Sequence, residues 1–551
     1  MLMTAGTKYV FMSGLLAGAF TCNIALAAQA IQEQDDIVAE RFEQSDGSKV
    51  LEIQQESDED NATDQQKIFI SDLKIQDVDI RATQKSDIAE ILSKYKNKSI
   101  SINELNVCVR EINSYLRENG YPAATAYLPA QESKNHEIVI NVELGKFGKI
   151  ILENNSTLSE TIINRLLSNI KTGEKVSGRI LETAIYNINE LGGVQAAGFF
   201  RPGKNVGETD IVIRIADIKK DAYSVYAENY GSDSSGRYRY NVNASWYNLL
   251  NAGDRISVNG MMSNQKQHNY GIQYEQLIAK NGTKANISIG RSDYELGSRY
   301  SSMGATGISS NIGINFSTPL WKTSKSRMSL NYGFTHRNLK DEMRDFGYIV
   351  EKHSDTAFIG INGSEVVGKT GLNYDISVFS GNLTADKAEV SGIPLKISTE
   401  GRFTKAVLNL SAQHRINKFF DFRVRGQAQK ASNLLDSSEQ FFLGGARGVR
   451  AYPQGEGSGD EGYQLTGELV YNTKIKGLAF STFYDLGHVI YSKDSAMSGG
   501  TTLQGWGVGV SYSKGNCWAK LEYARRIGLG NNATEAAKAK QRVWFMVGMQ
   551  W

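Results

Sequence analysis

The chain has 551 residues, more than one ordinary domain contains, and we expect two to four domains. Its 54 glycines and 26 tyrosines against six prolines favour strands and turns over helical bundles. The 61 basic and 59 acidic side chains nearly balance. This balance excludes a nucleic-acid partner, because such a protein would carry a basic surplus.

The first 27 residues have the features of a secretory signal peptide. Lys8 precedes an apolar run, which ends in the small-x-small sequence Ala25-Leu26-Ala27 that signal peptidase cleaves. We therefore predict a signal peptide over 1–27, with an uncleaved membrane anchor as the alternative. Residues 28–66 are rich in Asp and Glu and poor in large apolar side chains, and this composition predicts an acidic linker.

A β-α-α-β-β pattern then occurs twice, over residues 67–145 and 146–217. Ser101 with Glu104, and Thr157 with Glu160, have the spacing of capping boxes at helix starts. The first copy has expected strands at 68–80, 124–128 and 137–144 and helices at 86–95 and 101–119; the second has strands at 149–153, 194–200 and 210–215 and helices at 158–167 and 178–191. A repeat of about 70 residues indicates two α+β domains. One mixed domain of about 150 residues is the alternative.

From residue 218 to residue 551 apolar and polar residues alternate along the chain. Tyr238, Tyr240 and Val242 alternate with polar residues, and the last residues from Val543 to Trp551 place their apolar side chains on one face. No apolar run after residue 27 reaches the roughly 20 residues that a membrane-spanning helix needs. A run of this length behind a signal peptide, rich in Tyr and Trp, predicts an outer-membrane β-barrel of about 16 strands. A soluble β-sandwich is the alternative.

A glycine-rich segment, residues 443–463, interrupts these strands and contains Arg450. A guanidinium stays charged and presents a rigid fork of donors, so inside a barrel it requires a carboxylate on the wall. Asp485, in the strand-like segment 480–490, is the candidate partner. An exposed surface loop with an unrelated wall carboxylate is the alternative.

Three segments resemble the outer-membrane transporters of two-partner secretion, the TpsB family. Residues 119–129, with Gly120-Tyr121-Pro122 and Tyr127-Leu128-Pro129, are similar to the first periplasmic POTRA domain of that family. The barrel opening, residues 221–250, with Asn229-Tyr230-Gly231 and residues 236–239, is similar to its first hairpin, and residues 444–452 are similar to its sixth extracellular loop. The resemblance implies two α+β POTRA domains, at 67–145 and 146–217, followed by a transmembrane antiparallel β-barrel of 16 strands over 218–551.

The resemblance also implies which residues form the functional site. In the family the sixth loop folds into the barrel, and its arginine pairs with an aspartate of a wall motif. The corresponding positions are Gly448, Val449, Arg450, Ala451 and Tyr452 in the loop motif, and Phe483, Asp485 and Gly487 in the barrel-wall motif. Ala451 stands where the family has glycine, so a tight turn is less strongly predicted at this position. Members of the family often place an amphipathic helix in the pore as a plug, and Ile31 to Phe42 has the spacing for one, so residues 28–66 are either a linker or a plug.

The function implied by the resemblance is export of a large secreted TpsA-type exoprotein, whether a haemolysin, an adhesin or a contact-dependent inhibition toxin. The POTRA domains would lie in the periplasm and the barrel in the outer membrane, in contact with lipid and inserted by the barrel-assembly machinery. A barrel-assembly protein of the same superfamily and a passive porin are the alternatives; two repeats and an inward loop favour secretion.

The sequence contains no motif that indicates an enzyme, a cofactor or a metal site. It has no Gly-x-Ser-x-Gly elbow, no His-Glu-x-x-His helix and no phosphate-binding loop. Its six histidines are scattered, and Cys108 and Cys517 have neither metal-ligand spacing nor the number needed for a disulfide framework. We therefore expect no catalytic residues.

Overall fold

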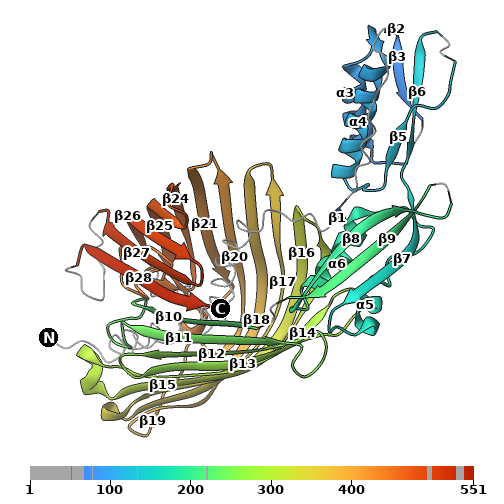
Figure 1. Cartoon of the computed structure of the whole chain (residues 1–551). Helices are drawn as coiled ribbons and strands as arrows, with labels where there is room; N and C mark the ends of the chain where they lie inside the picture. The colour runs from blue at the N-terminus through green and yellow to red at the C-terminus, as the bar shows by residue number, and fades with distance from the viewer. Residues whose placement is uncertain are drawn as a thin grey trace. The chain divides into compact units, whose positions relative to one another are not determined.

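The computed structural model describes residues 51–52, 67–76, 79–132, 135–205, 207–218, 221–492, 499–528 and 539–551. The predicted signal peptide and plug helix lie outside these residues, as does the acidic linker apart from 51–52. The described chain forms two compact units (Figure 1), one built from residues 48–219 with 321–324 and the other from the rest of the region after residue 219.

The first α+β domain contains two helices and short strands that form two sheets. Its elements are β2 (Lys67–Ile70), β3 (Asp72–Ile75), α3 (Ala82–Ser93), β4 (Lys98–Ser101), α4 (Ile102–Glu118), β5 (Thr125–Tyr127) and β6 (Glu137–Glu143). The single strand expected at 68–80 is wrong, because the chain divides at Ser71 into β2, which pairs with the unpredicted β4, and β3, which pairs with β6. Apolar alternation continues across this break, so the sequence pattern concealed it.

The capping box at the start of α4 is confirmed. The Ser101 hydroxyl accepts from the Glu104 N–H at 3.2 Å, and the Glu104 carboxylate accepts from the Ser101 N–H at 2.7 Å. The apolar face of α4 enters the core through Leu105, Cys108 and Ile112. Burial raises the pKa of the Cys108 thiol to about 11, and both Cys108 and Cys517 are free thiols.

The second α+β domain has the predicted order β-α-α-β-β, with no strand between its two helices. It consists of β7 (Lys146–Asn155), α5 (Glu160–Leu167), α6 (Gly178–Asn189), β8 (Val194–Pro202) and β9 (Glu208–Asp217), and its sheet has the order β1-β8-β9-β7 with β1 (Leu51–Glu52) parallel to β8. The predicted cap at Thr157 is wrong. Because α5 begins at Glu160, the residue in the cap position is Ser159, whose hydroxyl accepts from the Thr161 N–H at 3.3 Å. The Thr157 N–H instead donates to Asp217 at 3.0 Å.

The second unit is a closed antiparallel β-barrel. It consists of β10 (Ala222–Glu228), β11 (Arg239–Tyr247), β12 (Asp254–Ser263), β13 (Gln267–Leu277), β14 (Lys284–Glu295), β15 (Ala305–Lys322), β16 (Ser326–Met343), β17 (Tyr348–Val367), β18 (Thr370–Val390), β20 (Gly401–Arg415), β21 (Phe420–Ala431), β24 (Glu461–Asn472), β25 (Leu478–Ile490), β26 (Gly500–Lys514), β27 (Cys517–Arg526) and β28 (Gln541–Gln550). The two-residue strand β19 (Ile393–Pro394) extends the hairpin that begins with β18. These are 16 long strands, and β28, red in Figure 1, pairs with β10 to close the ring. The predicted strand number is therefore confirmed.

Alternation along each strand separates an apolar outer face from a polar lumen. Tyr240 and Val242 are 53% and 51% exposed, whereas Asn241 between them is 8% exposed. In β28, Val547 and Met549 are likewise exposed and Trp544 is buried. An apolar outer band is what a bilayer requires of a barrel. Among the described residues, no helix has the length and apolar character to cross a membrane.

Candidate functional site

The long connection between β21 and β24, residues 432–460, is buried although it contains few regular elements. It holds the short elements η3 (Ser437–Glu439), β22 (Phe441–Phe442) and β23 (Ser458–Gly459), and β22 pairs with β23. Leu443, Val449 and Tyr452 are at most 1% exposed. A connection over the solvent-exposed rim would not bury these side chains, so the segment folds into the lumen.

Close backbone approach explains the glycine in the loop motif. The Val449 N–H donates to the Leu443 carbonyl at 2.7 Å, which folds the loop tip back on itself. A Cβ on Gly448 would lie 1.8 Å from the Leu443 oxygen, so only glycine fits this position. Gly487, on the wall strand β25, faces the same Leu443, and a Cβ there would lie 2.6 Å from its side chain.

Arg450 and Asp485, which the sequence analysis singled out together, meet in the lumen. Arg450 Nε donates to Asp485 Oδ2 at 3.0 Å and Nη2 donates to Oδ1 at 2.8 Å, a bidentate contact. The Arg450 backbone N–H also donates to Oδ2 at 3.0 Å, and the Thr466 hydroxyl donates to Oδ1 at 2.9 Å. Both charged residues are 1% exposed. The aspartate therefore binds the side chain and the backbone of the loop tip at once.

The pair belongs to a larger tip cluster, which we define as Arg450, Asp485, Glu468 and Glu522. Arg450 Nη1 lies 2.6 Å from Glu522 and 3.7 Å from Glu468, which come from β27 and β24. The Phe483 ring lies under the guanidinium, with its centroid 3.2 Å from Cζ, in cation–π geometry. Sequence reasoning missed both glutamates, although each occupies a lumen-facing position in its strand.

The closing strand of the barrel also holds the loop tip. Trp544 on β28 is 2% exposed and donates its indole N–H to the Arg450 carbonyl at 2.7 Å. Its ring packs edge-on against Tyr230, with 5.8 Å between centroids. Arg526 stacks on Tyr452, the last residue of the loop motif, at 4.4 Å from the ring centroid. The loop tip thus contacts the closing strand β28 and its neighbour β27.

Ala451 fits at the position where the family has glycine, because the facing wall residue, Gly505, has no side chain. Ala451 is 0% exposed, and a Cβ built on Gly505 of β26 would lie 2.6 Å from the Ala451 methyl group. Its backbone is not among the positive-φ positions of the described chain. The methyl group therefore occupies space that Gly505 leaves open.

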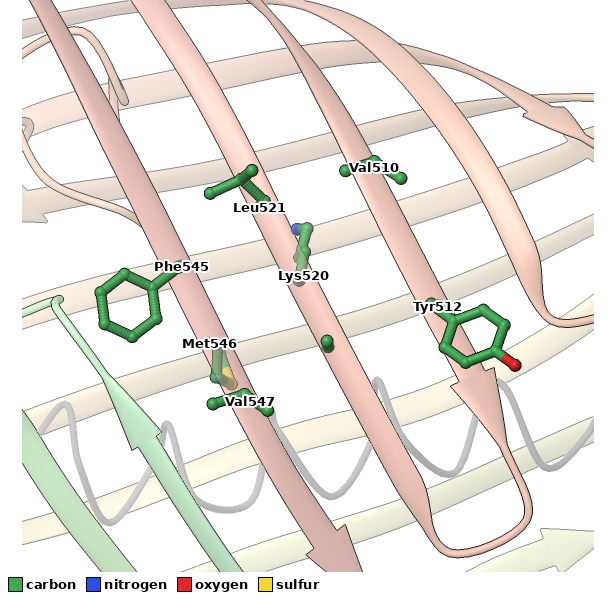
Figure 2. Close-up of a pocket in the computed structure, with 8 residues that line it drawn as sticks. Val510, Tyr512, Lys520, Leu521, Phe545, Met546 and Val547 are labelled. Atoms are coloured by element: carbon green, nitrogen blue, oxygen red, sulfur yellow. The ribbon is translucent and has the colours of Figure 1, made fainter.

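The hollow shown in Figure 2 is lined by none of the four residues of the tip cluster, although Lys520 in its lining lies 3.1 Å from Glu522. It has a volume of ≈ 250 Å³ and is lined by Val510, Tyr512, Ala519, Lys520, Leu521, Phe545, Met546 and Val547. Leu521 and Val547 are 48% and 50% exposed, on the outer face. Glu522, the next residue after Leu521, faces the lumen, since successive side chains of a strand point to opposite faces. Within the described part of the chain, no group of three or more His, Cys, Asp or Glu residues is placed to hold a metal ion.

Comparisons with known proteins agree with this arrangement. The family model of the haemolysin secretion/activation protein ShlB/FhaC/HecB matches residues 207–512, and that of the ShlB-type POTRA domain matches residues 71–145. The heme/hemopexin transporter protein HuxB of Haemophilus influenzae (strain 86-028NP) is 30% identical over 484 residues, which cover 86% of each chain. The hemolysin transporter protein HpmB of Proteus mirabilis is 21% identical over 397 residues, 70% of this chain and 69% of that protein.

A solved structure supports the fold. CdiB from Escherichia coli superposes with a TM-score of 0.65 at 18% identity, over 95% of this chain and 98% of that chain. The family model spans more than half of the 551 residues. The chain therefore belongs to the ShlB/FhaC/HecB family of haemolysin secretion/activation proteins, and it is a transporter of two-partner secretion.

Proposed function

We propose that the chain exports a large TpsA-type exoprotein through the outer membrane. The α+β domains bind the unfolded partner in the periplasm, and the partner then passes through the barrel once the loop 432–460 leaves its place in the lumen. No step requires catalysis by this chain, and we assign it none. The observation that carries the proposal is the attachment of a buried inward loop to the wall by Arg450, 1% exposed, and Asp485.

The strand edges of the α+β domains support recognition by β-augmentation, in which an extended chain adds a strand to a sheet. The edge of β8 already accepts such a strand, because Leu51 and Glu52 pair with Gly198 and Phe199. The edges of β5 and β8 share one feature: the Asn113 side chain donates to the Ala126 carbonyl of β5 at 3.1 Å and accepts from its N–H at 2.6 Å, and Asn189 makes the same two contacts with Ala196 of β8, at 3.2 and 2.5 Å. Because the two edges are alike in this respect, we assign docking of the partner to the strand edges of both α+β domains.

The driving force in this proposal is folding of the partner at the cell surface, which makes its return unfavourable, since no nucleotide is available outside the inner membrane. The kind of partner follows from the relatives. The relative that is 30% identical is named a heme/hemopexin transporter, whereas those at 21% and 22% are hemolysin transporters. We propose a partner that binds heme or hemopexin. Deletion of the gene should then abolish growth on hemopexin-bound heme. Normal growth, with loss of another large protein from the medium, would assign a haemolysin, an adhesin or an inhibition toxin instead.

The first test of the transport mechanism is a double-mutant cycle on Arg450 and Asp485. Arg450→Ala leaves buried carboxylates without their guanidinium, and Asp485→Ala removes the bidentate partner, so each change should reduce secretion and alter channel conductance. Because the two groups interact directly, the double variant should lose less than the sum, by a coupling of roughly 0.5–3 kcal/mol. Arg450→Lys should fail partly, since an ammonium cannot reproduce the fork.

The tip cluster changes the result expected for the double variant. An isolated pair of Arg450 and Asp485 would leave no unpaired charge in the double variant, but Glu522 and Glu468 still lose Arg450. They keep Lys520, 3.1 Å from Glu522, and Arg425, 3.7 Å from Glu468. The double variant should therefore remain below the wild type. Secreted partner and single-channel conductance are measured at matched levels of folded barrel, and strictly additive effects would refute the direct coupling. A passive porin would secrete nothing in any variant.

A further inference from the structure

The inward loop has a second charged attachment, near its first residues. Asp436 and Glu439, at the two ends of η3, are 6% and 4% exposed. Neither belongs to the loop motif at 448–452 or to the wall motif at 483–487. Unpaired carboxylates at this depth would be costly, so their partners decide where this part of the loop is held.

Asp436 binds to the wall at β17. One carboxylate oxygen lies 2.7 Å from Lys352 Nζ, and the other accepts from the Ser438 N–H at 3.1 Å, which caps η3. Asp341 of β16 lies 3.7 Å from the same lysine and accepts from the Tyr294 hydroxyl at 3.3 Å. Lys352 is therefore shared between a wall carboxylate and a loop carboxylate.

Glu439 binds to two further wall cations. One carboxylate oxygen lies 2.9 Å from Arg337 Nη1 on β16, and the other lies 2.8 Å from Lys405 Nζ on β20. The Glu439 carbonyl accepts from Lys405 at 3.0 Å and from Gln429 at 2.9 Å. Side chain and backbone are thus both attached, as they are at Arg450. We call the set Asp436, Glu439, Asp341, Arg337, Lys352 and Lys405 the base cluster.

The two clusters lie on different arcs of the barrel and have opposite polarity. The base cluster uses β16, β17 and β20, whereas the tip cluster and Trp544 use β24, β25, β27 and β28, and the closed strand order separates these sets. At the base the loop supplies anions and the wall supplies cations; at the tip the loop supplies the cation and the wall supplies anions. The loop is therefore held by two regions of the wall that supply opposite charges to it.

We propose that Asp436 and Glu439 are positioning residues that hold the base of the loop independently of Arg450. Loss of the tip contacts alone then leaves the loop in the lumen, and the loop leaves the lumen only when both clusters are broken. This inference rests on the proposed function for its relation to export, but the position of the loop can be measured without a partner.

The test neutralises the base cluster without changing its shape. Asp436→Asn with Glu439→Gln is made in the wild type and in the Arg450→Ala variant, and trypsin cleavage of the loop after Arg447 is followed in outer-membrane fractions with equal amounts of heat-modifiable barrel. Cleavage should be several-fold faster when both clusters are broken than with either change alone, and conductance should be highest there. Glu439→Asp keeps the charge, so its cleavage rate should stay close to that of the background in which it is made.

Lys340→Gln is the matched control. Lys340 lies on the same strand β16 as Arg337, but its ion pairs with Glu342 and Glu351, at 2.8 and 3.0 Å, do not involve the loop. If the base variants are cleaved no faster than this control in both backgrounds, the inference is overturned. Should Asp436→Asn with Glu439→Gln not reach the folded level, Lys352→Gln with Lys405→Gln removes one wall cation from each of the two loop carboxylates, and the same comparison applies. If the cleavage rate changes but secretion of the partner does not, the role of the base cluster is supported and the proposed export mechanism is refuted.

Discussion

At the scale of single residues, the contacts of Arg450 with two wall carboxylates require a guanidinium. Its guanidinium satisfies Asp485 through two parallel bonds and still reaches Glu522 at 2.6 Å. Its backbone contributes as well, because the N–H donates to Asp485 and the carbonyl accepts from Trp544. Breaking such a buried pair by removing one partner costs about 3–5 kcal/mol, so the loop position is strongly specified by this one residue.

The contact between Ala451 and Gly505 provides a residue-scale prediction. Gly505→Ala places two methyl groups 2.6 Å apart, closer than real carbon atoms approach. It should therefore displace the loop tip and raise basal conductance several-fold. Ala451→Gly removes the opposing methyl group and should restore the conductance of Gly505→Ala, while by itself it should have little effect on secretion. The measurement is single-channel conductance of all three variants. A Gly505→Ala channel that Ala451→Gly does not correct would show that the tip is not seated against β26.

At the scale of elements, β28 closes the barrel and supports the loop. Its register with β10 runs from Ser224↔Gln550 to Glu228↔Met546. Trp551 extends this pairing, because its N–H and carbonyl exchange hydrogen bonds with Tyr223 at 3.0 Å each. The two rings stack with 5.9 Å between centroids. The end of the chain is therefore part of the seam.

Removal of Trp551 should lower the amount of folded barrel, because it deletes both hydrogen bonds and the stacked ring at the seam. Trp551→Phe keeps the backbone bonds and an aromatic ring, and it should remain near the wild type. Heat-modifiable protein in outer-membrane fractions measures the folded amount. Unchanged folded levels after the deletion would mean that the seam forms without the last residue.

At the scale of the whole molecule, the first α+β domain has its own core. The buried cluster that includes Ile88, Cys108 and Ile112 is built only from residues between Ile70 and Leu144. The barrel strands contribute no side chain to this buried cluster. Deletion of residues 68–144 should therefore abolish secretion of the partner and leave a heat-modifiable barrel in the outer membrane. Normal secretion by the deletion variant would remove the recognition role assigned to this domain.

Much of the fold could be predicted from periodicity. The outward side chains of Tyr240 and Val242, and those of Val547 and Met549, have the exposure that alternation implies. The capping box at Ser101 could be predicted from the sequence because its two hydrogen bonds join residues only three positions apart. The cap of α5 was not, since Thr157 and Ser159 are both suitable residues and only the observed helix start at Glu160 selects Ser159.

Features that depend on neighbours along the chain could be predicted: the α+β repeat, the alternating strands and the two short motifs that contain Arg450 and Asp485. Which distant strands meet follows from the folded barrel alone. Glu468, Glu522 and Trp544 reach the loop tip because the closed barrel brings β24, β27 and β28 around it. Asp436 and Glu439 reach their cations on β16, β17 and β20 for the same reason. Lumen-facing charges recur on many strands, and a pairwise contact between them has no period in the sequence, because it is set by barrel closure and by the path of the loop across the lumen.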